Sequence, residues 1–158
     1  MTKQVEIFTD GACRRNPGPG GYGVVLLHES RRRELSGGFR LTTNNRMEIL
    51  AAIVGLEALK EPCRVRLYSD SQYLVNAIEK GWAARWRANG WMRNQREPAV
   101  NPDLWERLLE LCRVHQVQFL WVRGHAGHPE NERCDRLATA AADGPDPAVD
   151  EGYERARP

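Results

Sequence analysis

Carboxylates stand at positions in this chain where metal-dependent chemistry is possible. Asp10 and Asp70 each follow an apolar alternating run, while Glu48 and Asp135 fall in segments with helical spacing. Residues at strand ends of an α/β sheet gather at one edge, where sites form. Hard cations such as Mg²⁺ prefer carboxylate oxygens. Two cations about 4 Å apart can activate water and stabilise the leaving oxygen in phosphodiester cleavage.

Each of these carboxylates also has a simpler interpretation. Asp70 could cap the helix that follows it, because aspartate is a preferred N-cap residue. Asp10, which precedes a glycine, could belong to a turn. Glu48 and Asp135 could lie on solvated helix faces. Spacing alone does not show that the carboxylates converge, and without a cation their mutual repulsion would make a cluster unstable.

The elements that must position these carboxylates follow an α/β pattern. Apolar alternation predicts strands over residues 4–10, 22–27, 33–42, 64–69 and 117–122. Apolar stripes at helical spacing predict helices that begin near residues 44, 71, 81, 102 and 129. The resulting order, β-β-β-α-β-α-α-α-β-α, gives a mixed sheet whose first three strands are antiparallel and whose faces carry helices. The glycine-rich and proline-rich segment 16–21 is predicted to be a loop.

The chain length suits one domain with a single core. Its 158 residues, 41% of them hydrophobic, predict one domain over residues 1–143. Residues 144–158 are rich in proline, glycine and charge, which predicts a flexible C-terminal tail. The net charge of +2 does not by itself indicate a partner for the chain.

The ends and the cysteines bear on localisation. No basic segment followed by an apolar run stands at the N-terminus, and no run approaches the length of a membrane span. We therefore expect a cytoplasmic protein without a membrane partner. Its 4 cysteines are widely spaced, without a C-x-x-C pair, which predicts free thiols and no zinc site.

A basic cluster interleaved with tryptophan occupies residues 80–96. Its members are Lys80, Arg85, Arg87, Arg93 and Arg96, with Trp82, Trp86 and Trp91 among them and no acidic residue. Aromatic rings beside cations suit contact with a nucleic-acid backbone. Alternatively, the tryptophans pack into the core. We expect each tryptophan to be partly buried and the arginines to be exposed.

The motifs that surround the carboxylates resemble those of bacterial type 1 ribonuclease H. The resemblance lies in four blocks that occur in the family's order and span residues 4 to about 142. The blocks are TDGAC at 9–13 with NPGPGGYG at 16–23, TTNNRME at 42–48, SDSQY at 69–73 and GHAGHPENERCD at 124–135. Such long ordered matches are specific, and they do not include the C-terminal tail.

The resemblance implies a ribonuclease H-like fold, with a five-stranded mixed sheet flanked by helices, and a defined chemistry. The family's metal-binding carboxylates fall on Asp10, Glu48, Asp70 and Asp135, and its mobile-loop histidine falls on His125. A near-neutral pKa suits a histidine there to proton transfer or product release. The implied activity is endonucleolytic hydrolysis of the RNA strand of RNA/DNA hybrids, leaving 5′-phosphate and 3′-hydroxyl ends. Mg²⁺ is the implied cofactor, with two ions per active site and Mn²⁺ as a substitute.

The resemblance also implies substrate contacts. The matching positions are Cys13, Asn16, Thr43, Asn44, Asn45, Gln72, Trp82, Arg85, Trp86, Arg87 and Asn101. Amide side chains can sense the 2′-hydroxyl that distinguishes RNA from DNA. Thr43 and Asn101 match the family's pocket for a DNA phosphate. The chain departs from relatives at Leu41, Ala88 and Asn89, where basic residues are common, which predicts weaker substrate affinity.

Three other functions remain to be weighed. A DNA-cutting recombinase-type nuclease would share the fold, but DNA offers no 2′-hydroxyl to the amide side chains. A non-catalytic nucleic-acid-binding module would not need all of the carboxylates. A nucleotide-binding loop at 18–23 is disfavoured, because a strand rather than a helix follows it. We expect a monomer with no obligate protein partner.

Overall fold

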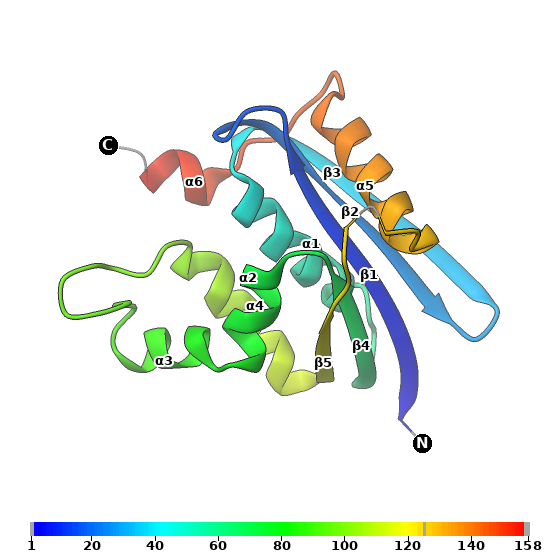
Figure 1. The fold of residues 1–158 in the computed structure, drawn as a ribbon, viewed down its shortest axis with the longest axis horizontal. Helices are drawn as coiled ribbons and strands as arrows, with labels where there is room; N and C mark the ends of the chain where they lie inside the picture. The colour runs from blue at the N-terminus through cyan, green and yellow to red at the C-terminus, as the bar shows by residue number, and fades with distance from the viewer. Residues whose placement is uncertain (1, 125, 157–158) are drawn as a thin grey trace.

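The computed structural model, which describes residues 2–124 and 126–156, contains the predicted five-stranded mixed sheet (Figure 1). The strands are β1 (Lys3–Cys13), β2 (Gly18–His28), β3 (Arg31–Thr42), β4 (Cys63–Ser69) and β5 (Gln116–Trp121). They lie in the order β3-β2-β1-β4-β5. The pairs β1–β2 and β2–β3 are antiparallel, whereas β1–β4 and β4–β5 are parallel. The fold predicted from the sequence is therefore confirmed.

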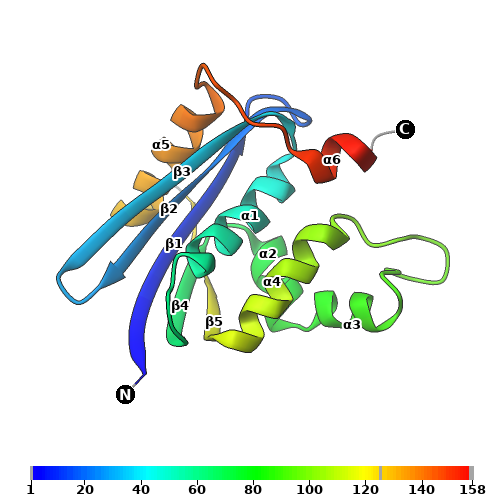
Figure 2. The same cartoon turned by 180° about the vertical axis from the view of Figure 1, so that it is seen from behind.

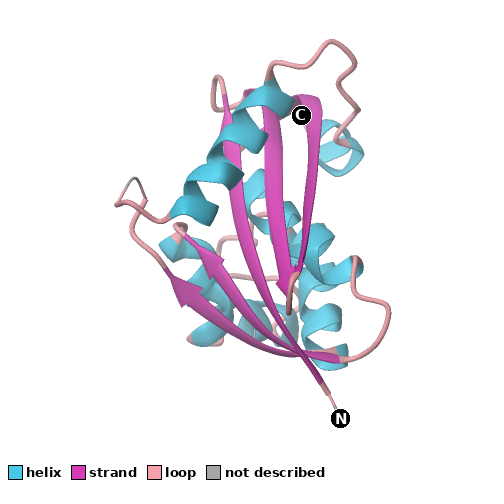
Figure 3. Cartoon of the chain, turned by 90° about the vertical axis from the view of Figure 1, so that its right-hand side faces the viewer, coloured by secondary structure: helices cyan, strands magenta, loops and turns pink. Residues whose placement is uncertain are grey.

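Helices cover both faces of this sheet. They are α1 (Asn44–Glu57), α2 (Gln72–Glu79), α3 (Trp82–Ala88), α4 (Pro102–Val114), α5 (Pro129–Ala142) and α6 (Glu151–Ala156). Helix α5 lies across β1, β2 and β3 on one face, while α1, α2 and α4 lie on the other (Figures 1 and 3). Seen from behind, α1 runs between the sheet and α4 (Figure 2).

The central position of α1 explains its burial. Residues Arg46–Ile53 are all buried, so the helix is enclosed on nearly every side rather than along the single stripe that the sequence suggested. Ile7 and Leu67 from the sheet and Trp105 from α4 are fully buried in the same core. A helix enclosed in this way can carry functional side chains in rigid positions, because close packing leaves little freedom.

The sequence predicted a loop over the glycine-rich segment 16–21. In the structure β2 already begins at Gly18, so most of this segment is strand. Its glycines permit α5 to lie directly on the strand backbone. A Cβ built on Gly23 would lie 2.3 Å from the backbone oxygen of Cys134, and one on Gly21 would lie 2.5 Å from that of Ala138. The absence of side chains at these positions therefore sets how closely α5 approaches the sheet.

The predicted flexible tail needs correction over residues 148–156. The Ala148 N–H donates to the Gly38 carbonyl at 2.9 Å, and the Arg40 N–H donates to the Ala148 carbonyl at 2.9 Å. Asp150 is buried against Arg46, and α6 follows it. Composition suggested a loose segment, but one buried ion pair and two backbone hydrogen bonds attach it to β3 and α1.

Two smaller expectations concern the cysteines and the membrane. Cys13, Cys63, Cys112 and Cys134 are all free thiols, as predicted. Over residues 2–124 and 126–156, no helix has the length and apolarity needed to span a bilayer.

We predict that Gly23→Ala destabilises the protein by about 3 kcal/mol, because the new methyl group would overlap the α5 backbone, which has no flexible end to move aside. Urea unfolding measures the change. Gly144→Ala is the matched control, since its Cβ would lie 3.3 Å from the Ala141 oxygen and 3.9 Å from the Ala140 oxygen, without overlap. Equal stability of the two variants would show that α5 does not rest on the Gly23 backbone.

Candidate active site

Parallel pairing of β1 with β4 brings two carboxylates to one edge of the sheet. Thr9 is in register with Ser69, so the next residues, Asp10 and Asp70, stand side by side. Glu48 comes from α1, which packs against β1. One carboxylate oxygen from each of Asp10, Glu48 and Asp70 lies within 4.8 Å of the others. The convergence that spacing alone could not show is thus present for these three.

The local alternatives for Asp10, Glu48 and Asp70 do not hold. Ser71, not Asp70, caps α2, since its hydroxyl accepts a hydrogen bond from the Leu74 N–H at 3.1 Å. Asp10 lies inside β1, paired with Gly23, and not in a turn. Glu48 is buried and not on a solvated face. The side chain of Asp70 is consequently available to the cluster.

Backbone at Gly11 binds the two buried carboxylates together. Its N–H donates to Asp10 Oδ1 at 2.9 Å and also to Glu48 Oε1. A Cβ on Gly11 would lie 2.6 Å from the backbone nitrogen of Glu48. Only glycine therefore permits α1 to approach β1 closely enough for this contact.

Burial gives the cluster unusual electrostatics. Burial and then the neighbouring carboxylates of Glu48 and Asp70 raise the pKa of Asp10 far above its ordinary value. Burial also raises the pKa of Glu48, against hydrogen bonds from Asp10 and the Gly11 N–H, and the charges of Asp70 and Asp135 raise it further. Like charges held out of water favour either a retained proton or a bound cation.

Asp135 and His125 stand differently from the other predicted catalytic residues. Asp135 lies on α5, is half-buried, and is close enough for its charge to act on Glu48. It is not part of the three-residue cluster within 4.8 Å. His125 lies outside the described residues.

The donors fit a hard divalent cation. They are oxygens only, and they come from rigid elements. Asp10 and Glu48 are buried, and among the residues that the structure describes neither accepts a hydrogen bond from an arginine or a lysine. Mg²⁺ and Mn²⁺ take such oxygen ligands, whereas zinc favours nitrogen and sulfur. The shared charge of the carboxylates explains why a cation would be held there.

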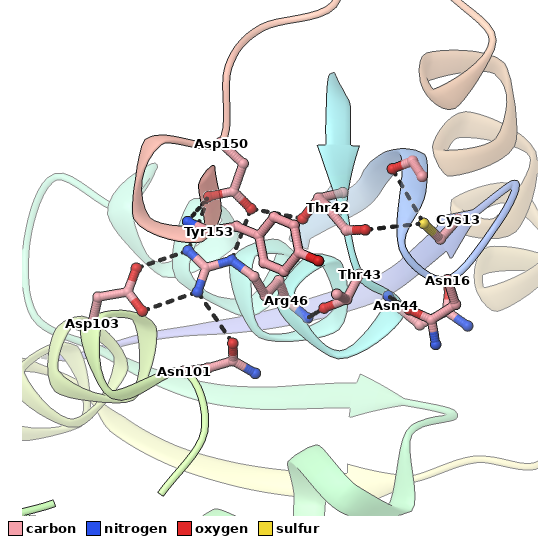
Figure 4. A network of polar contacts seen from close by, with 11 residues as sticks. Cys13, Asn16, Thr42, Thr43, Asn44, Arg46, Asn101, Asp103, Asp150 and Tyr153 are labelled. Carbon is pink, nitrogen blue, oxygen red and sulfur yellow. Dashed lines mark hydrogen bonds and ion pairs between the residues drawn. The ribbon is translucent and has the colours of Figure 1, made fainter. Parts of the chain in front are cut away.

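Several predicted substrate contacts lie beside β1 and the start of α1. Asn16 Oδ1 accepts a hydrogen bond from the Asn44 N–H at 3.2 Å, and Cys13 Sγ lies 3.5 Å from the Thr42 carbonyl (Figure 4). Asn16, Asn44 and Asn45 are exposed. Gln72 is also exposed, in the first turn of α2 next to Asp70. The fold thus leaves these amide side chains accessible around the carboxylates.

Thr43 and Asn101, from the expected phosphate pocket, both accept hydrogen bonds from Arg46, Thr43 from its backbone and Asn101 from its side chain. The Arg46 N–H donates to Thr43 Oγ1 at 3.2 Å, and Arg46 Nη1 donates to Asn101 Oδ1 at 3.1 Å (Figure 4). Two carboxylates that sequence reasoning missed, Asp103 and Asp150, hold the same arginine. Arg46 lies within a matched motif block, but nothing local to Asp150 signals its role.

The tryptophans of the basic cluster are partly buried, as the sequence predicted, and one of its arginines is more closely packed than expected. Trp82 is half-buried beneath Lys80, whose Nζ lies 5.8 Å from the ring centroid, and Arg85 is exposed. Trp86 packs against Trp105, with ring centroids 6.1 Å apart. Arg87 was expected to be exposed, but it is half-buried and pairs across α3–α4. Its Nη1 lies 3.1 Å from Glu110 Oε1. Acidic residues far along the chain thus partly neutralise the cluster.

Comparisons with known proteins identify relatives of this chain. Residues 2–143 match the family model described as RNase H. A ribonuclease H of Desulforamulus reducens is 71% identical over 148 residues, with 94% of this chain and 93% of that protein covered. A ribonuclease H of Syntrophus aciditrophicus is 72% identical over 151 residues, with 96% and 87% covered.

Solved structures resemble the fold at lower identity. The structure of LC9-RNase H1, described as a type 1 RNase H with the type 2 active-site motif, has a TM-score of 0.82 and 33% identity. That match covers 99% of this chain and 82% of the other. RNase H1 from Halobacterium salinarum NRC-1 gives a TM-score of 0.67 and 28% identity, with 89% and 98% covered.

The carboxylate cluster predicts that the metal-free protein loses folding stability as pH rises. A raised pKa means that the folded state retains a proton that the unfolded state loses above about pH 4, so stability falls as pH rises from there. Asp10→Asn should therefore unfold at about the same urea concentration as wild type at pH 4. At pH 7 in chelator it should be more stable by about 2 kcal/mol.

Adding Mg²⁺ at pH 7 should reduce the difference in stability between Asp10→Asn and wild type, since a cation that binds only the folded wild type stabilises the wild type. Asp146→Asn, at an exposed position outside the cluster, is the control and should follow wild type. A difference between Asp10→Asn and wild type that does not change from pH 4 to pH 7 would contradict the assigned electrostatics.

Proposed function

The chain belongs to the RNase H family, and on that premise we propose that it is an endonuclease that hydrolyses the RNA strand of RNA/DNA hybrids. The products expected are 5′-phosphate and 3′-hydroxyl ends. The observation that carries the proposal is the meeting of Asp10, Glu48 and Asp70 oxygens within 4.8 Å in a chain of this family. The burial of Asp10 and Glu48 and the all-oxygen chemistry support metal-assisted hydrolysis rather than nucleophilic catalysis by a side chain.

The cofactor proposed is Mg²⁺, with two ions per active site and Mn²⁺ as a substitute. When bound, such ions supply Lewis-acid stabilisation of the leaving oxygen and lower the pKa of the attacking water. Support comes from the donor set, which contains more negative charge than a buried site tolerates unneutralised.

The metal-binding role proposed for each carboxylate follows from the residues around it. Carboxylate oxygens of Asp10, Glu48 and Asp70 lie within 4.8 Å of one another, and both neighbours act on the charge of Asp10, which is therefore proposed as the shared ligand. Glu48 and Asp70 would each hold one side of the site. Asp135, half-buried on α5, would complete the weaker side. His125 is proposed to assist proton transfer or product release, on the motif match alone.

Recognition of the hybrid is proposed to divide between two surfaces. Exposed amides at Asn16, Asn44, Asn45 and Gln72, with Cys13 beside them, would read 2′-hydroxyls on the RNA strand. The DNA strand would meet Thr43 and Asn101 at one phosphate. It would meet the basic cluster further along, where the candidates are Trp82, Arg85, Trp86 and Arg87. Among these, Arg85 is the most accessible, since Trp86 is packed and Arg87 is paired.

We predict that the protein with Mg²⁺ cuts only the RNA strand of a labelled RNA/DNA hybrid. It should leave matched RNA and DNA duplexes and single strands intact, and chelator should stop the reaction. Gel analysis of end-labelled strands measures this. Cutting of duplex DNA would instead favour a recombinase-type nuclease, and binding without cutting would favour a non-catalytic module.

We predict that Asp10→Asn lowers hybrid cleavage on the order of 10³-fold or more, because the shared ligand loses its charge. Binding should largely survive, because the exposed contacts are unchanged. Cleavage rates and filter binding give the two readouts, and Asp146→Asn is the matched control with unchanged cleavage. Loss of binding together with cleavage would refute the assigned role of Asp10.

A further inference from the structure

The segment of residues 148–156 attaches beside the residues proposed to hold a DNA phosphate. Asp150, from this segment, is buried, and so is Arg46 on α1. Asp150 Oδ2 accepts hydrogen bonds from Arg46 Nε at 2.8 Å and from Thr42 Oγ1 at 2.6 Å. Asp150 Oδ1 accepts from Arg46 Nη2 at 2.9 Å and from the Tyr153 N–H at 3.2 Å. The acid thus joins α6 to the start of α1 (Figure 4).

Every N–H of the Arg46 guanidinium has an acceptor. A guanidinium has five N–H donors and no acceptor. Two bonds go to Asp150, two to Asp103 at 3.0 and 2.7 Å, and one to Asn101 Oδ1 at 3.1 Å. The orientation of the guanidinium is therefore set by its carboxylate partners. A side chain so enclosed and saturated is not itself available to bind substrate.

The bond to Asn101 orients that amide. Because Arg46 can only donate, the amide oxygen of Asn101 must face it, which directs the NH₂ group elsewhere. Asn101 occupies the N-cap position of α4 but makes no side-chain capping bond there, and its φ is +64°. An asparagine at an N-cap would ordinarily use its oxygen on its own helix. Here the oxygen is used by Arg46, and the donor end remains for another acceptor.

We propose that Asp150 is a positioning residue for the DNA strand: through Arg46 it fixes Asn101 so that the amide NH₂ faces a backbone phosphate beside Thr43. The Thr43 hydroxyl accepts from the Arg46 N–H, so its own hydrogen stays free to donate to the same phosphate. The proposal deepens the proposed function and rests on it. It gives the C-terminal segment a role in substrate binding.

The proposal is testable because positioning and charge predict opposite effects of removing Asp150 on phosphate binding. Two carboxylates against one guanidinium leave a negative balance, so removing Asp150 would favour phosphate binding if only long-range electrostatics acted. If Asp150 acts by positioning, its loss frees Arg46 and weakens phosphate binding instead. A hydrogen bond to a charged group justifies an expected rise in KM of about tenfold.

The test is steady-state cleavage of a hybrid by wild type, Asp150→Asn, Asn101→Ala and the double variant. It is run at a temperature where circular dichroism shows all of them folded. We expect Asp150→Asn to raise KM about tenfold with kcat within about twofold. The double variant should be no worse than Asn101→Ala. Glu151→Gln removes the same charge at the neighbouring exposed position and should leave KM unchanged or lower.

A modified substrate separates positioning from general destabilisation. One neutral methylphosphonate is placed in turn at each DNA linkage. At the linkage that meets Thr43 and Asn101, wild type should lose affinity and Asp150→Asn should lose almost none. Asp150→Glu, which keeps the charge, should recover part of the KM effect. If Asp150→Asn does not fold, Asp103→Asn, whose acid is half-exposed, replaces it in both measurements.

Failure of the positioning role can be distinguished from failure of the proposed function. If wild type does not cut hybrids, the function itself is wrong. If wild type cuts and Asp150→Asn shows an unchanged or lower KM, the positioning role is overturned. The positioning role is also overturned if the effects of Asp150→Asn and Asn101→Ala on KM add in the double variant. A fall in kcat equal to the fall in kcat/KM would overturn it as well.

Discussion

Repulsion between two buried carboxylates is the constraint around which this structure is organised. Carboxylate oxygens of Asp10 and Glu48 lie within 4.8 Å of each other in a site that excludes much of the solvent, and their raised pKa values express the cost of holding both charges there. Packing must supply the free energy that opposes this repulsion. The enclosed helix α1, the parallel pairing of β1 with β4 and the Gly11 N–H shared by both acids supply it.

Rigidity on one side of the site is accompanied by accessibility on the other. The carboxylates come from strands and from an enclosed helix, whereas Asn16, Asn44, Asn45 and Gln72 are exposed near strand and helix ends. A metal site needs fixed ligands, since small displacements weaken coordination and alignment. A duplex read through its backbone and sugars needs accessible donors and acceptors instead. The fold separates these requirements between its core and its surface.

A second charge problem lies at the start of α1. Arg46 is buried, and a buried guanidinium requires partners for its charge and for all its N–H groups. Asp103 from α4 and Asp150 from the C-terminal segment provide them, with Asn101 taking the remaining N–H. This arginine therefore connects three parts of the chain that are remote in sequence, and it contributes to the attachment of residues 148–156 to the domain.

The sequence by itself determined the order of strands and helices along the chain, the helix that carries Glu48 and the identity of the metal-binding candidates. Alternation and helical spacing are local, and long motif blocks are specific. Tertiary structure alone decided whether the acids converge, because that depends on the register of β1 with β4 and on the approach of α1. It also decided that Gly18–Gly21 continue a strand under α5, that Arg87 pairs with α4, and that Asp150 anchors the final helix. Each of these depends on a neighbour far along the chain, which local composition does not contain.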